Sequence, residues 1–128
     1  MSIRIVPDTN QPSAAIEIPL ERPLPDYDLH DLEHATPRDV DVILVSQGFR
    51  DLVDDARGVL TELLSGTGFE ITQLTGAICP DNEESYRPGL WIVLRDMHSA
   101  QGHELSPESR ARVSATAEAL VKRLQLAE

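Results

Sequence analysis

Two histidines four residues apart stand in the acidic stretch 25–41, PDYDLHDLEHATPRDVD. On a helix, His30 and His34 would share one face, with Asp31 beside them as an oxygen ligand. Imidazole nitrogens and carboxylate oxygens are ligands of zinc and related cations. The stretch therefore defines a candidate metal site formed by His30, His34 and Asp31.

The same histidines also have a purely structural explanation. They lie ahead of the helix start expected at Thr36, where helical geometry is not assured, and the stretch lacks the glutamate of a His-Glu-x-x-His motif. A solvated acidic approach to the helix accounts for these residues equally well. We favour this interpretation over metal binding.

The single cysteine, Cys79, excludes an internal disulfide. A thiol beside a histidine can act as a nucleophile, and His98 and His103 follow it in the chain. If strands at 69–79 and 89–97 form an antiparallel hairpin, however, Cys79 and His98 lie at its opposite ends, about 25 Å apart. The favoured interpretation of Cys79 is a small buried thiol.

Other chemical motifs are weak. His98 and His103, with Asp96 and Glu104, form a second candidate cation cluster, but their irregular spacing fits no ligand rule. The sequence contains no Gly-x-Gly-x-x-Gly turn, no phosphate-binding Gly-Lys-Ser/Thr loop and no Gly-x-Ser-x-Gly elbow. We therefore expect no cofactor, and the sequence disfavours an enzyme.

The chain is strongly acidic, with 22 acidic against 11 basic residues and a formal net charge of -11. This charge repels phosphate backbones and anionic lipid, so direct binding to nucleic acid or to a membrane is not expected. A basic protein partner or a cation would suit it, although solubility alone also explains it. With no apolar run of membrane-spanning length, we expect a cytoplasmic protein.

Residues 1–35 differ in composition from the rest, because they contain five prolines separated by short apolar patches. Prolines at this frequency prevent a helix and limit strands to short edge segments. We therefore expect an extended, Pro-rich N-terminal arm over 1–35 with short edge strands, followed by a single α+β domain over 36–128.

The apolar pattern after Thr36 predicts a helix, because Thr36, Pro37 and Asp39 have the chemistry of a helix start. Apolar side chains then recur every three or four residues as far as the glycines of 65–68, which predicts one continuous helix. An alternative places a strand at 41–46, because Val42, Ile43 and Val45 are β-branched. A continuous helix would outgrow a small core and expose one end to a second subunit.

The C-terminal half predicts two strands, at 69–79 and 89–97, and a helix that opens at Ser106. A change of alternation near Gln73 to Gly76 indicates a bulge in the first strand. The connection over 80–89 is acidic and long for a hairpin, so it could be a recognition loop. The expected fold is α+β, with two helices packed on a small antiparallel sheet.

These features favour a non-enzymatic interaction or assembly protein that self-associates, with a dimer favoured, and binds a protein partner. The alternative is a metal-assisted enzyme or metal-binding regulator that uses His30, His34 and nearby carboxylates. The residues expected at the contact surfaces are three on the predicted long helix and five in the acidic connection: Val42, Val45, Phe49, Asp81, Glu83, Glu84, Tyr86 and Arg87.

Overall fold

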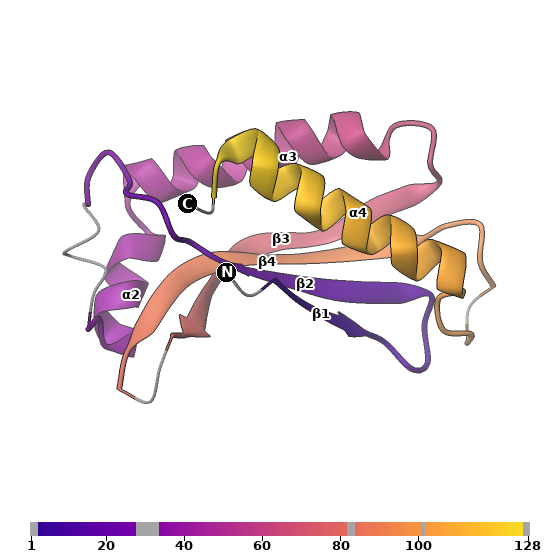
Figure 1. Cartoon of the computed structure of the whole chain (residues 1–128), viewed down its shortest axis with the longest axis horizontal. Coiled ribbons are helices and arrows are strands. Elements are labelled where there is room, and N and C mark those ends of the chain that lie inside the picture. Colours follow the sequence, from indigo (N-terminus) through magenta and orange to yellow (C-terminus); the bar gives the residue numbers. More distant parts are fainter. Residues whose placement is uncertain (1–2, 28–33, 82–83, 101, 127–128) are drawn as a thin grey trace.

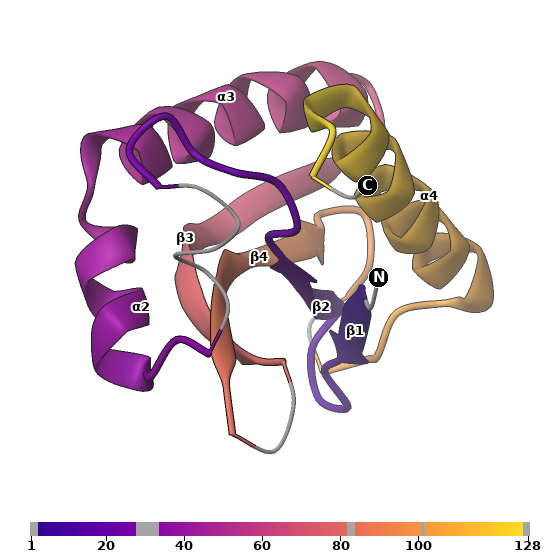
Figure 2. The same ribbon diagram turned by 60° about the vertical axis from the view of Figure 1, so that its left-hand side comes forward.

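The computed structural model describes residues 3–27, 34–81, 84–100 and 102–126. Helices α3 and α4 lie side by side over one face of an antiparallel sheet, and α2 lies near one end of the long strands (Figures 1 and 2). This arrangement confirms the α+β class. The elements follow the order β1 (Arg4–Pro7), β2 (Ser13–Pro19), α2 (Pro37–Leu44), α3 (Gln47–Leu64), β3 (Phe69–Pro80), β4 (Tyr86–Asp96) and α4 (Pro107–Leu124).

The strands are ordered β1-β2-β4-β3 in the sheet, and each neighbouring pair is antiparallel. The expectation of short edge strands in 1–35 is right for β1 and wrong for β2, which pairs with β1 on one side and β4 on the other. Ile16 and Ile18 of β2 are buried in the core. The expected N-terminal arm is therefore not confirmed as a separate segment.

The single long helix predicted after Thr36 is wrong, and so is the alternative strand at 41–46. The chain forms α2, turns at Val45 and Ser46, and starts again as α3. Ser46 accepts a hydrogen bond from Phe49 N, and Asp26 Oδ2 accepts one from Gly48 N. These two acceptors satisfy N–H groups that a continuous helix would have bonded internally, so the break is stable.

The helix starts expected from local sequence are confirmed. Thr36 caps α2 in a capping box with Asp39, and Ser106 caps α4 with proline in its first turn. One core joins the helices to the sheet through aliphatic side chains from β2, β4, α3 and α4, together with Phe49. None of the helices in the described residues combines the length and the apolar character that crossing a bilayer requires.

The β3–β4 hairpin is longer than expected, since its strands end at Pro80 and begin at Tyr86. The predicted bulge is present, between Ile71 and Gln73. Beyond it, the strand passes beneath the α2–α3 corner. A Cβ placed on Gly76 would lie 2.8 Å from Leu44 Cδ2 and 2.9 Å from Phe49 Cε1, so glycine allows both helices to approach the strand closely.

Candidate interaction surface

The candidate metal residues are only partly described. His30 and Asp31 lie outside the described residues, and His34 is exposed with a positive φ of 55°. Among the residues that the structure does describe, no group of three His, Cys, Asp or Glu side chains could hold a metal ion. The metal site therefore stays a prediction from sequence.

Cys79 is fully buried, in agreement with the structural interpretation of this thiol. It pairs with Arg87 near the loop end of the hairpin, whereas His98 follows Asp96 at the other end. The pKa of Cys79 is raised to about 12, mainly because the thiol is buried; the negative charge of Glu17 also raises it, and the positive charge of Arg4 lowers it by less. A thiol in this setting is a poor nucleophile.

The three partner-binding residues predicted on the long helix do not share one environment. Val42 and Val45 are 54% and 64% exposed, which is unusual for large apolar side chains. Phe49 is 1% exposed and belongs to the core. Its placement on a contact surface is therefore wrong, because the turn at Ser46 directs this side chain against the sheet.

The acidic connection places its predicted contact residues in different settings. Asp81 and Glu84 are exposed, whereas Glu83 lies outside the described residues. Arg87 Nε lies 3.0 Å from Asp81 Oδ2, and its guanidinium also donates to Leu20 O. Tyr86 is half-buried, and its N–H bonds Ala35 O. Arg87 and the backbone of Tyr86 thus hold the hairpin end against the N-terminal segment.

The outer side of β3 presents backbone hydrogen-bonding groups. Met97 N bonds Gly68 O at one end of the hairpin, and Asp81 N bonds Ser85 O at the other. Opposite residues of two antiparallel strands alternate between hydrogen-bonded and non-hydrogen-bonded pairs. These two hydrogen bonds therefore determine which residues of β3 point their backbone N–H and C=O groups away from β4. We define the β3 edge as the outward-facing backbone of Ile71, Leu74, Gly76 and Ile78.

The two edges of the sheet differ in their protection. β1 has four residues and ends at Pro7, whereas β3 has twelve and pairs with only β4 among the described residues. Short edge strands, proline and lysine are common means of preventing unwanted pairing. Lysine is absent from 69–80, and its one proline is the last residue of β3. Besides its bulge and the charge of Glu70, the β3 edge therefore carries no such protection within the described residues.

Two separate hollows, which together we call the seam, lie beside this edge between β3 and α3. A cavity of about 320 Å³ lies under the α2–α3 corner, and a second of about 350 Å³ lies at the C-terminal end of α3. The lining of the first includes Leu44, Val53 and Gly76. The second is lined partly by Leu64 and Phe69. Apolar side chains of a partner strand could enter both.

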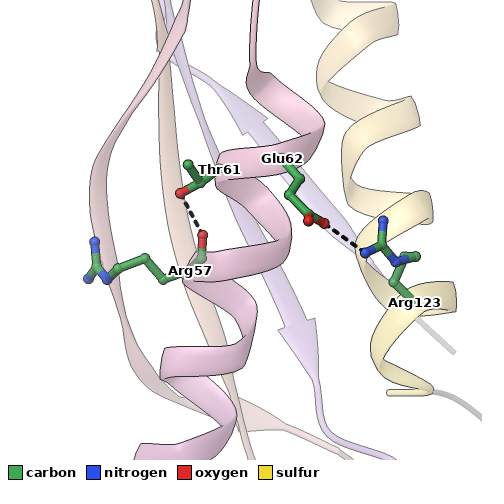
Figure 3. A network of polar contacts seen from close by, with 4 residues as sticks. All are labelled: Arg57, Thr61, Glu62 and Arg123. Atoms are coloured by element: carbon green, nitrogen blue, oxygen red, sulfur yellow. Dashed lines mark hydrogen bonds and ion pairs between the residues drawn. The ribbon is translucent and has the colours of Figure 1, made fainter.

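One side of α3 borders this seam. We define the α3 stripe as Arg50, Asp54, Arg57 and Thr61, whose spacing of four, three and four places them along one helix face. Arg50 and Asp54 line the first cavity, and Thr61 lines the second. Figure 3 shows Arg57 and Thr61 on the opposite side of α3 from Glu62.

The two sides of α3 also differ in charge. Glu62 Oε2 lies 2.8 Å from Arg123 Nη2 of α4, so this side is paired within the chain (Figure 3). The α3 stripe contains both basic residues of the helix. No ion pair within the described residues involves Asp54 or Arg57. The stripe was overlooked in the sequence, although its spacing is visible there.

Comparison with protein-family models gave no match for this chain, and neither the curated proteins nor the solved structures gave one.

Proposed function

We propose that this protein is a non-enzymatic interaction and assembly subunit that self-associates and binds a protein partner. The observation that carries the proposal is the β3 edge. A long edge strand without lysine or an internal proline, beside apolar hollows, is the arrangement used in β-strand addition, where backbone bonds provide affinity and side-chain pockets provide specificity. The contact surface consists of the β3 edge, the seam and the α2–α3 corner.

Exposed Val45 supports this choice of surface, whereas Val42 lines a separate hollow with Asp26 and Tyr27. Leu44 and Phe49 flank the α2–α3 corner and are the side chains closest to the Cβ position of Gly76. The corner, with exposed Val45, therefore lies above the β3 edge. Apolar side chains at this place gain about 1.5–3 kcal/mol each when a partner buries them completely.

The charge of the chain supports a basic protein partner. A formal charge of -11 accelerates association with a positive surface and disfavours nucleic acid. Exposed Asp39, Asp41, Asp51 and Asp55 extend this charge along α2 and α3. We further propose a cytoplasmic location, in keeping with the single buried cysteine.

The proposal is tested by light scattering after size-exclusion chromatography over a dilution series. We expect the mass of an oligomer at high concentration and of one chain on dilution. A Val45→Lys/Val53→Lys variant places two charges at the seam and should stay monomeric. Val6→Lys is the matched control, since Val6 is 45% exposed on the opposite edge strand. It should behave like the wild type.

Binding of another protein is tested separately with a display library of random peptides selected on the immobilised protein. The proposal expects enrichment of extended apolar sequences with basic residues. It also expects that the Val45→Lys/Val53→Lys variant loses these peptides while Val6→Lys retains them. A wild-type protein that is monomeric at every concentration and selects no peptide contradicts the proposed function.

A further inference from the structure

We infer that the β3 edge pairs with the β3 edge of a second copy about a twofold axis that passes the bulge, with Asp54 of each copy against Arg57 of the other. This inference rests on the proposed self-association and specifies its geometry. It predicts a continuous sheet of both copies, with their α3 helices antiparallel and adjacent. The occupant of the surface is thus the same chain.

The strand itself is symmetric about the proposed axis. The bulge adds one residue between Ile71 and Gln73. The residues whose backbone N–H and C=O point away from β4 are therefore Phe69 and Ile71 before the bulge, and Leu74 and Gly76 after it. An antiparallel twofold placed between Thr72 and Gln73 therefore pairs Ile71 with Leu74 of the other copy. The same axis pairs Phe69 with Gly76 of the other copy.

The helix supports the same axis independently. Arg50 and Asp54 lie by Thr75 and Gly76, whereas Thr61 lies by the segment from Phe69 to Ile71. The bulge lies halfway between these two segments of β3. The midpoint of the α3 stripe lies between Asp54 and Arg57. A twofold axis through both midpoints pairs Asp54 with Arg57 of the other copy, and Arg50 with Thr61.

Charge and the position of the bulge favour a second copy over an unrelated strand. Like charges repel two chains of -11 over most of their surfaces, but the antiparallel arrangement of the α3 stripe sets Asp54 of each copy against Arg57 of the other. The bulge bends β3, and bulges hinder pairing with regular strands. The same strand in a second copy has its bulge at the same point, so the two bulges lie opposite each other at the axis.

The test uses charge reversal and complementation at low ionic strength. In a homodimer, Asp54→Arg and Arg57→Glu each bring two like charges together at both symmetry-related contacts between positions 54 and 57. Each should raise the dimer dissociation constant by about tenfold or more. A one-to-one mixture of the two variants restores opposite charges at both contacts, so it should form a heterodimer with about wild-type affinity. Asp55→Arg is the control, because Asp55 lies off the α3 stripe, and it should have little effect.

The outcomes are distinguishable. Weakened single variants with recovery in the mixture support the inferred axis. If the wild type dimerises and the single variants dimerise equally well, or if the mixture does not recover, the axis is wrong while self-association stands. If the wild type is monomeric yet selected peptides bind at the seam, the edge accepts another protein and the inference is overturned. A monomer that binds no peptide overturns both proposals.

Discussion

Ser109 Oγ, in the first turn of α4, donates a hydrogen bond of 2.8 Å to Asp96 Oδ2 at the end of β4. The same carboxylate accepts hydrogen bonds from Ser99 Oγ and His98 N. Burial raises the pKa of Asp96, but these hydrogen bonds and the nearby charge of His98 outweigh it, so the pKa lies below its ordinary value. Asp96 thus joins the strand to the start of α4.

We predict that Asp96→Asn lowers the free energy of unfolding at neutral pH by about 1–3 kcal/mol, because the three donors lose a charged acceptor. The carboxylate's stabilising contribution is present above its unfolded pKa and is lost as the pH falls below about 4. Urea unfolding at pH 7 and pH 3 measures this. The difference from wild type should shrink at pH 3, whereas exposed Asp55→Asn should differ little at either pH.

The buried thiol of Cys79 should be protected from thiol reagents in the folded protein. Its pKa is raised to about 12, so the thiolate is scarce at pH 8, and the sulfur is also covered. We expect reaction with an aromatic disulfide reagent to be slower by about two to three orders of magnitude than in denaturant. Rapid labelling under native conditions would show that Cys79 is accessible.

Because of the same thiol, we predict that the free energy of unfolding decreases in alkali. The unfolded thiol deprotonates near 9.0, whereas the folded one keeps its proton up to about pH 12. The folded state therefore binds more protons in this range, and the free energy of unfolding falls as the pH rises through it. Cys79→Ala should reduce this slope. If the slope is unchanged in that variant, groups other than Cys79 cause the loss of stability in alkali.

Two glycines should respond oppositely to alanine. A Cβ on Gly89 would lie 2.5 Å from Cys79 Sγ and 2.6 Å from Ile18 O, so Gly89→Ala should cost about 1–3 kcal/mol or more. A Cβ on Gly58, inside α3, would meet nothing within 4 Å. Gly58→Ala should stabilise the protein by about 0.5–1 kcal/mol. Thermal unfolding of both variants provides the comparison.

The turn between α2 and α3 should tolerate loss of its cap. Ser46→Ala removes the acceptor for Phe49 N and should cost about 1 kcal/mol in urea unfolding. The helices should not merge, because Asp26 Oδ2 still accepts from Gly48 N. Equal far-UV circular dichroism in variant and wild type is the expected result. A clear gain in helical signal would show that Ser46 alone causes the break.

Local sequence alone determined the start of each of α2 and α4. A hydroxyl cap, a proline in the first turn and an early carboxylate act within one turn of helix, so Thr36 and Ser106 mark those starts without reference to the rest of the chain. The β3–β4 pair and the bulge in β3 also follow from patterns within neighbouring residues.

Only the tertiary structure decided the break at Ser46, the internal place of β2 and the candidate surface. The break depends on Asp26, which is 22 residues away in the chain. β2 is internal because β4, which follows much later in the chain, pairs along its second side. The α3 stripe is a contact surface only because the fold lays it along the β3 edge. Each of these outcomes is a pairing between distant segments, and local propensity and periodicity contain no information about which distant segments will meet.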